Sequence, residues 1–470
     1  MARDKTKLAL FAGLALSGAA LMAARGAGRR APPRGGRLAA HAGGRPHVVV
    51  VGAGFGGLEA ARPLAGIPGL DLTLIDAHNY HLFQPLLYQV ATAALSPADI
   101  ASPVRAVLPA RDGFRVLMAA VSGVDTVRRQ VMCGDRSLPY DCLVIATGSK
   151  PSHFGHPEWA AAAPGLKTLD DAVALRNAIV SALERAALTA DATEQERLLT
   201  FVLIGGGPTG VEMAGAIGEF VRDRLLASYA IAPERASIIL VEAGKRVLAE
   251  FAPNLSADAA AALKSLGVTI RTGVKVTNIE AGRVHLGSET IMAETVIWAA
   301  GMAATPVASW LGVQPGHGGR VAVGPDLRVT GHGDVFVIGD ASLARDPHGH
   351  PLPGLAPVAK QQGAYVAEAI LRRLGGQPDP APFRYRDYGT MATIGRNKAV
   401  AQFGSVRLSG FPAWLLWAGA HIAFLISFRS RALVSLEWAF AYVTHGRSAG
   451  LIIADEAPPR SASRADPQAG

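Results

Sequence analysis

The sequence predicts an α/β fold in which one Rossmann-type domain is inserted into another, followed by an amphipathic helical region at the C-terminal end. A strand, a glycine-rich turn and a helical pattern occur twice, at residues 47–66 and 200–220. Further short apolar strands are found at residues 140–149, 294–301 and 333–342. Alternation of strands and helices of this kind is typical of doubly wound parallel sheets.

The composition agrees with a globular α/β protein of several domains. The chain has 470 residues, of which half are hydrophobic and 53 are glycine, and this length allows two or three domains with sizeable cores. Its two cysteines, Cys133 and Cys142, are too few for a disulfide framework, so a reducing compartment is expected. The histidines form no cluster with cysteine or carboxylate at metal-ligand spacing, so we expect no metal.

The positive charge is concentrated at the N-terminal end. The formal net charge is +9, and residues 1–46 alone carry nine lysines and arginines against one acid. The rest of the chain therefore has no basic surplus that would predict nucleic-acid binding, whereas the basic segment suits an anionic membrane surface. The apolar run at residues 8–24 is interpreted either as a membrane anchor or leader, or as a dispensable extension.

These patterns divide the chain into six segments. The first domain is expected in two parts, with the inserted domain between them and the helical region after them. The expected segments are the extension (1–45), the first part of domain one (46–165), the inserted domain (166–320), the second part of domain one (321–400), the helical region (401–454) and a disordered tail (455–470).

Each glycine-rich turn has the spacing that a dinucleotide requires. The first glycine allows the tight turn, the second lets a pyrophosphate approach the backbone, and the third lets helix and strand pack closely. Free N–H groups at the helix start can bind phosphate, and an acid at the end of the next strand can accept a ribose hydroxyl. The first set is Gly52, Gly54, Gly57 and Asp76, and the second is Gly205, Gly207, Gly210 and Glu242.

Two other strand ends predict that the first domain binds FAD. Asp340 follows Gly339 at one strand end and can bond the ribityl hydroxyls of a flavin, while Ala341 continues the chain toward the pyrophosphate. Thr147 and Gly148 end another strand of the same domain. An aspartate that only caps a turn is the alternative for Asp340.

The inserted domain is expected to bind NADH. The carboxylate of Glu242 suits the free 2′-hydroxyl of NADH and repels the 2′-phosphate of NADPH. Lys245 and Arg246 lie close behind and weaken this exclusion. Gly301, at the end of a later strand, is also expected at the NADH site.

Two sets of motifs point to one protein family. The first set contains GAGFGG, ATGS, GGGPTG and GDAS in this order, and the second contains NYHLFQPLLYQVATAALSP, GVEMAG, APVAKQQG, GTMATIGR, GFPAWLLW, FLISFRSRALV and EWAFAYVT. Together they resemble the type II NADH:quinone oxidoreductases, single-chain respiratory flavoproteins that do not pump protons. The resemblance covers about residues 46–452. It implies that NADH gives hydride to FAD and that the reduced flavin then reduces a membrane quinone.

The resemblance also implies a quinone site. The stretch 356–362 is similar to the segment that lines the quinone entrance of the family, although Pro357 stands where the family commonly has glutamine. The residues implied at the quinone are Ala359, Lys360 and Gln361, with Gln361 and Gln362 as catalytic residues. A glutamine amide can bond a quinone carbonyl, but at a helix start it can equally cap backbone groups.

Two further positions are implied near the flavin. Glu212 lies in the first turn of the helix after Gly210, where the helix dipole favours its ionised form. By resemblance it faces the nicotinamide and flavin and takes part in proton movement; a carboxylate that only stabilises its helix is the alternative. Gln84, Pro85 and Tyr88 are expected against the flavin, although the aromatic side chains of this segment suit a hydrophobic core equally well.

The C-terminal region is expected to dock on one membrane leaflet without spanning the bilayer. Its apolar run at 411–428 is about long enough to span, but Pro412 opens it and His421 lies within it. Aromatic and basic side chains that suit lipid headgroups include Trp414, Trp417, Trp438, Tyr442, Arg429 and Arg431. The expected location is the cytoplasmic face of the inner (plasma) membrane. An additional N-terminal anchor and a homodimer remain open.

Two other classes of function remain open. Disulfide-reductase-like flavoproteins and sulfide:quinone oxidoreductases use cysteines, but Cys133 and Cys142 are nine residues apart and form no CxxC pattern. A redox-sensing or signalling flavoprotein would bind NADH without fast turnover. A quinone site together with a membrane-docking region favours the enzyme over this alternative.

Overall fold

A six-stranded sheet forms the centre of the first domain in the computed structural model, which describes residues 44–225, 229, 231–444 and 450–453. The strand order is β20 (Arg328–Val329), β21 (His332–Val337), β9 (Cys142–Ile145), β1 (His47–Val51), β2 (Asp71–Asp76) and β5 (Phe114–Met118). All neighbours are parallel except β20 with β21. The extension up to residue 43 and the tail from 454, with the anchor and disorder expected there, lie outside the described residues.

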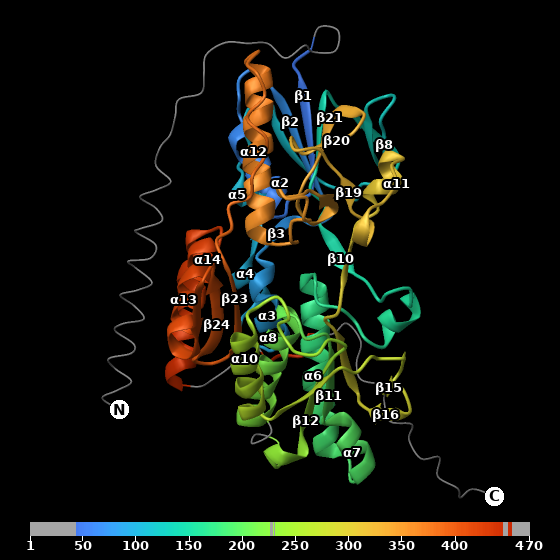
Figure 1. Ribbon diagram of the computed structural model, residues 1–470, viewed down its shortest axis with the longest axis vertical. Coiled ribbons are helices and arrows are strands. Elements are labelled where there is room, and N and C mark those ends of the chain that lie inside the picture. Colours follow the sequence, from blue (N-terminus) through green and yellow to red (C-terminus); the bar gives the residue numbers. More distant parts are fainter. Residues whose placement is uncertain (1–43, 226–228, 230, 445–449, 454–470) are drawn as a thin grey trace, which may run out of the picture.

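Alternate valines of β1 build the core on both faces of this sheet. Val48 and Val50 pack with the helices α2 (Phe55–Leu64) and α12 (Ala356–Leu374), which lie side by side (Figure 1). Val49 and Val51 face α11 (Val307–Leu311) and a three-stranded antiparallel sheet. Both faces are covered, so the strand is apolar throughout, as expected for a central parallel strand. The covering sheet consists of β6 (Gly123–Asp125), β7 (Gln130–Cys133) and β8 (Arg136–Pro139).

The inserted domain repeats this plan with a four-stranded parallel sheet. Its order is β13 (Val268–Thr272), β12 (Ser237–Glu242), β11 (Thr200–Ile204) and β17 (Thr295–Trp298). The helices α6 (Leu169–Leu188), α8 (Pro208–Ile217) and α10 (Pro253–Ser265) belong to the same domain (Figure 1). The two doubly wound units and the insertion of one within the other confirm the predicted fold class.

Two short antiparallel strands connect the domains and set their limits. β10 (Ser149–Pro151) pairs with β18 (Met302–Ala304), so the chain enters and leaves the inserted domain at one place. Residues after β18 return to the first domain, because Val307 and Leu311 of α11 pack against β1. The inserted domain therefore starts and ends earlier than the expected limits of 166–320.

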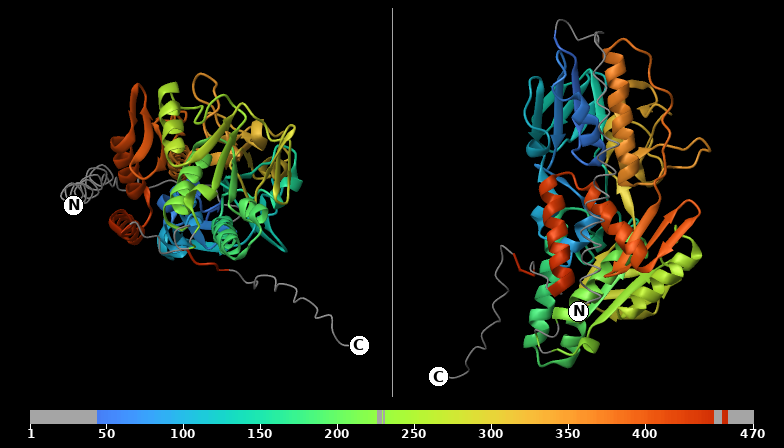
Figure 2. Two further views of the ribbon diagram at one scale, coloured as in Figure 1. Left: turned by 90° about the horizontal axis from the view of Figure 1, so that it is seen from below. Right: turned by 90° about the vertical axis from the view of Figure 1, so that its left-hand side faces the viewer.

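The C-terminal region is a compact unit packed on the inserted domain. It consists of β23 (Thr390–Gly395), β24 (Lys398–Phe403), β25 (Val406–Ser409), α13 (Gly410–Phe424) and α14 (Phe428–Thr444). β23 contacts α8, and β24 contacts α10. The expected boundary between residues 400 and 401 falls inside β24, and the unit begins at β23. Its two helices lie on one outer side of the molecule (Figure 2, right).

Candidate active site

The first glycine turn joins β1 to α2 in a conformation that only glycine allows at two positions. Gly52 has φ 103°, a region that side chains disfavour. A Cβ on Gly57 would lie 1.7 Å from the carbonyl oxygen of Gly52, so a side chain there would push the helix off the strand. At Gly54, by contrast, a Cβ would meet nothing within 4 Å. The turn is therefore closed on the protein side and open on the side where a pyrophosphate is expected.

The second turn, between β11 and α8, has the same geometry. Gly205 has φ 114°, and a Cβ on Gly210 would lie 1.8 Å from the Gly205 oxygen. A Cβ on Gly207 would meet nothing within 4 Å. Two turns far apart in the sequence thus have matching closed and open positions. The agreement supports two separate dinucleotide sites.

The acid that follows each turn is held by backbone N–H groups. Asp76 accepts hydrogen bonds from the N–H groups of Ala53 at 2.6 Å and His78 at 2.7 Å. Glu242 accepts from Gly206 and Gly244, both at 2.5 Å. Each carboxylate is fixed beside its glycine turn, where sequence reasoning expected a ribose contact.

The two cations behind Glu242 differ in their surroundings. The guanidinium of Arg246 donates to the carbonyl oxygens of Phe251 at 2.7 Å and Ala249 at 2.6 Å. These hydrogen bonds hold the loop at residues 246–251 together and use the donors of the guanidinium within it. Lys245 is exposed at the surface. If a cation near Glu242 makes NADPH binding less unfavourable, as expected from the sequence, it is Lys245 and not Arg246.

Asp340 lies where three distant segments meet. It belongs to the turn after β21, and its carboxylate accepts a hydrogen bond from the Ser149 hydroxyl at 2.7 Å. The ammonium group of Lys167 lies 3.6 Å from the same carboxylate and donates to Ser149 at 3.3 Å. Sequence reasoning identified Asp340 and missed Ser149 and Lys167, because nothing in the local pattern links the three segments.

The neighbours of Asp340 only partly match the expected flavin contacts. Gly339 and Gly148 both have positive φ, at 67° and 70°, and lie at the carboxyl ends of β21 and β9. The Thr147 hydroxyl lies 2.6 Å from that of Thr305. The side chain of Ala341 is fully buried in the core with Val337, so it packs the fold and leaves only its backbone for a cofactor.

Glu212 lies between the inserted domain and the C-terminal sheet. It is on α8, and one carboxylate oxygen accepts a hydrogen bond from the N–H of Thr393 on β23 at 3.3 Å. Burial raises the pKa of Glu212 to about 8, and the Thr393 N–H only partly opposes this shift. Desolvation thus opposes the helix dipole, which favours the ionised form of this carboxyl group.

The residues implied at the quinone lie near the start of α12 but face different ways. Ala359 is buried against the first glycine turn, where a Cβ on Gly56 would lie 3.1 Å from its carbonyl oxygen. The ammonium of Lys360 lies 5.4 Å from the ring centroid of Phe424 on α13. The Gln361 amide makes two hydrogen bonds of 2.9 Å with the backbone of Arg386. Lys360 thus contacts the C-terminal unit through Phe424.

Gln362 differs from its neighbour in being fully buried. Its side-chain oxygen accepts a hydrogen bond from the N–H of Gly339 at 2.6 Å. Its side-chain nitrogen has no partner among the described residues. This glutamine thus supports the backbone next to Asp340.

The segment that contains Gln84 connects the first turn to α13 and α14. Gln84 begins a short 3-10 helix, η1 (Gln84–Leu86), and is partly buried, whereas Tyr88 lies in the hydrophobic core. The ring of Phe83 packs edge-on against His421 on α13, with centroids 6.1 Å apart. Sequence reasoning missed this contact with His421, whose imidazole is partly buried and has its pKa lowered to about 4 by desolvation.

The cysteines show no arrangement for thiol chemistry. Both are free; Cys133 ends β7, and Cys142 begins β9 and is buried. Burial raises the pKa of Cys142 to about 12, which disfavours the reactive thiolate.

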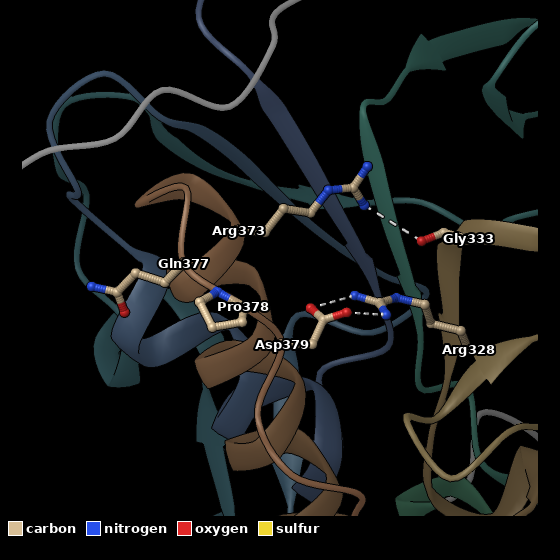
Figure 3. A pocket seen from close by; sticks show the side chains of 6 residues that line it. All are labelled: Arg328, Gly333, Arg373, Gln377, Pro378 and Asp379. Carbon is tan, nitrogen blue, oxygen red and sulfur yellow. Dashed lines mark hydrogen bonds and ion pairs between the residues drawn. The ribbon is translucent and has the colours of Figure 1, made fainter.

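A shallow pocket lies at the opposite end of the first domain (Figure 3). In it, Arg328 makes a paired hydrogen bond to Asp379 at 2.7 and 2.9 Å, and Arg373 points toward the carbonyl of Gly333. Gly333 lies near the amino end of β21, whereas Gly339 follows its carboxyl end. This pocket is therefore separate from the glycine turns.

Comparisons with known proteins agree with this arrangement. A family model described as pyridine nucleotide-disulphide oxidoreductase matches residues 46–363. A type II NADH:quinone oxidoreductase of Mycobacterium tuberculosis (strain ATCC 25618 / H37Rv) is 39% identical, and the match covers 86% of this chain and 89% of that protein. The demethylphylloquinone reductase of Synechocystis sp. (strain ATCC 27184 / PCC 6803 / Kazusa) is 30% identical over 84% of this chain and 96% of its own length. The solved structure of NDH2 from Plasmodium falciparum in complex with NADH has a TM-score of 0.78 at 21% identity, covering 86% of this chain and 99% of that one.

Proposed function

Because the chain belongs to the type II NADH:quinone oxidoreductases, and so transfers two electrons from NADH to a quinone through a flavin, we propose that the Gly52 turn holds FAD and the Gly205 turn holds NADH. The matched geometry of the two turns supports two dinucleotide sites, and the Asp340 carboxylate held by Ser149 and Lys167 in the first domain supports FAD there. Steady-state oxidation of NADH with a short-chain quinone, together with the absorption spectrum of the bound cofactor, tests the activity and the flavin content. A sample that binds NADH without quinone turnover would favour a signalling flavoprotein.

The residues of the first domain fit FAD. The open side of Gly54 admits a pyrophosphate, and Asp76 is fixed beside it for the adenosine ribose. Asp340, held by Ser149 and Lys167, presents a carboxylate for the ribityl hydroxyls. FAD, when bound there, supplies the group that accepts hydride from NADH and passes two electrons to the quinone.

Glu212 is placed to hold the proton that quinone reduction consumes. Reduction of a quinone by NADH takes up one proton per turnover, and a carboxyl group with a pKa of about 8 is protonated near neutral pH. Glu212 lies on α8, directly after the Gly205 turn where the pyrophosphate of NADH is proposed, and this location supports a role beside the dinucleotide. We assign Glu212 the role of a proton-holding group in the active site.

Replacing Glu212 with glutamine is expected to flatten the pH dependence of stability. The folded state keeps a proton that the unfolded state releases above about pH 4.5, so the free energy of unfolding falls as pH rises toward about 8. Glu212→Gln removes this term, while Glu368→Gln, at an exposed position of α12, is the matched control. Urea unfolding between pH 5 and 9 measures the effect. An equal pH slope in all three proteins would contradict the assigned protonation.

Replacing Glu242 with glutamine is expected to raise the relative efficiency with NADPH by about tenfold. The change removes a negative charge that repels the 2′-phosphate, and it leaves one of the two backbone N–H groups without its acceptor. Activity with NADH should therefore fall while activity with NADPH rises. The measurement is kcat/KM for both nucleotides. Lys245→Ala serves as the opposite control, because it should weaken NADPH use further; an unchanged ratio in Glu242→Gln would remove this acid as the discriminator.

We further propose that α13 and α14 dock the protein on the membrane. Large apolar side chains on the outer side of these helices are exposed: Leu416, Phe424, Phe428, Leu436, Phe440 and Val443. They recur at helical spacing, which places them on one face of each helix. Exposed large apolar side chains at this spacing are typical of a lipid-contacting surface.

Several of the aromatic and basic residues expected at the lipid headgroups instead make contacts within the protein. Trp414 and Trp417 are buried, and Trp438 stacks on Trp417 with ring centroids 5.2 Å apart. The interpretation of these tryptophans as headgroup contacts is therefore wrong, since they anchor the helices to the protein. Arg431 donates to the carbonyl of Leu425 at 2.8 Å and so joins α14 to the end of α13. Of the helices in the described ranges, none is long and apolar enough to cross a bilayer.

A further inference from the structure

Phe154 has an unusual position beside the proposed nicotinamide site. It follows the connecting strand β10, and its side chain is 67% exposed. A single exposed apolar residue needs no explanation by itself. Phe154, however, has φ 52°, a backbone conformation that bulky residues rarely adopt and that the fold must maintain at a cost in free energy.

The aromatic ring lies directly against Gly301. A Cβ on Gly301 would be 2.5 Å from the tip of the Phe154 ring, so a side chain at Gly301 would displace this ring. The segment before Phe154 is fixed to the same strand end. The N–H of Ser152 donates to the carbonyl of Gly301 at 3.1 Å, and the indole N–H of Trp298 donates to the carbonyl of Ser152 at 2.9 Å.

Two further ring contacts support this segment. The rings of His153 and Trp298 lie with centroids 4.6 Å apart, and the Phe154 ring meets Trp298 edge-on at 5.8 Å. The His153 imidazole also bonds the carbonyl oxygen of Ala163 at 2.9 Å. The backbone that carries the exposed Phe154 ring is therefore held in place by its neighbours, although most of the surface of the ring has no protein contact.

The order of strands places Gly301 at the nicotinamide end of NADH. Along the carboxyl edge of the inserted sheet, β12 ends at Glu242, β11 leads into the Gly205 turn, and β17 leads to Gly301. A dinucleotide with its adenosine ribose at the acid and its pyrophosphate at the glycine turn extends its second nucleoside past β17. Gly301 is also followed at once by β18, which leads back to the flavin domain.

We propose that Phe154 is a positioning residue for the reduced nicotinamide, with its ring forming an apolar wall against the nicotinamide nucleoside of NADH. This proposal rests on the assignment of NADH to the Gly205 turn. A planar aromatic ring can stack against the dihydropyridine ring and limit its orientation toward the flavin. The strained backbone at Phe154 is then the means by which the ring is held at the strand end.

The proposal predicts a change confined to the reductive half-reaction. Anaerobic rapid mixing of the FAD-loaded enzyme with NADH gives the apparent Kd for NADH and the limiting rate of flavin reduction. Phe154→Ala should raise this Kd by roughly three- to tenfold and lower the limiting rate. Reoxidation of the reduced enzyme by a short-chain quinone should be unchanged. Leu188→Ala, at an 86% exposed position of the same domain, is the control and should behave as the unsubstituted enzyme.

A second variant separates positioning from a structural role. Phe154→Gly removes the ring and also relieves the positive φ, so its Tm should not fall although its affinity for NADH does. A lower Tm with unchanged NADH kinetics in either variant would overturn the proposal, as would unchanged kinetics alone. Gly207→Val tests the underlying site: if it keeps full NADH affinity, NADH binds elsewhere. If Gly207→Val loses NADH while the Phe154 variants bind it normally, only the role of Phe154 is wrong.

Discussion

Replacing Gly54 with valine is expected to yield a folded, colourless protein without NADH:quinone activity. The protein itself leaves room for a side chain at Gly54, since a Cβ there would meet nothing within 4 Å, and its φ of −71° suits any residue. The branched side chain would instead occupy the space through which the pyrophosphate approaches the start of α2. We expect bound flavin per chain to fall by more than about tenfold, measured from absorbance after extraction.

The third glycine of the same turn provides a control with the opposite outcome. A Cβ on Gly57 would lie 1.7 Å from the oxygen of Gly52, so Gly57→Ala should impair folding itself and lower the yield and Tm of the protein. Circular dichroism distinguishes the two variants. Gly54→Val with native helix content and full flavin absorbance would show that the pyrophosphate does not lie at this turn.

Replacing both Leu436 and Phe440 with glutamate is expected to release the protein from membranes. Both side chains are exposed on one face of α14, so the substitutions should leave the core intact. Each removes roughly 1.5–3 kcal/mol of apolar burial in lipid and adds a charge that anionic headgroups repel. Partition onto anionic vesicles should fall by about a hundredfold or more, measured by flotation.

Activity separates loss of docking from loss of folding. The double variant should still oxidise NADH with a water-soluble quinone and should fail with a quinone dissolved in vesicles. Val127→Glu, at an exposed position remote from both helices, is the matched control. Truncation of the region is a poorer test, because Trp417 and Val434 are buried in the core that would be opened. If the double variant still floats with vesicles, α14 is not the docking surface.

Local sequence patterns predicted the parts of the site that depend on short-range geometry. The glycine turns, the acids Asp76 and Glu242, and the strand ends at Gly148 and Gly339 follow from the residue types that a strand–turn–helix unit requires. These features have the same physical basis in both domains. For this reason the fold class could be predicted from the sequence alone.

The remaining features depend on contacts between distant segments. Lys167 of the inserted domain meets Asp340 of the first domain only in the folded chain, and the pKa of Glu212 depends on the packing of β23 over α8. The sequence could not show whether Trp417 faces lipid or the protein core, since a tryptophan on an apolar helix suits both environments. Burial decides such cases, and burial is a property of the whole fold.

One hydrophobic core runs through three separate parts of the chain. It joins Leu87 of the first domain, Leu203 of the inserted sheet and Trp417 of α13 without interruption. The proposed docking face on α13 and α14 therefore shares one packed core with the strand edge proposed to receive the nicotinamide. If this face docks as proposed, contact with a lipid surface would fix the orientation of the whole enzyme, so that the plane of the bilayer and the direction of hydride transfer would keep a constant angle in every molecule.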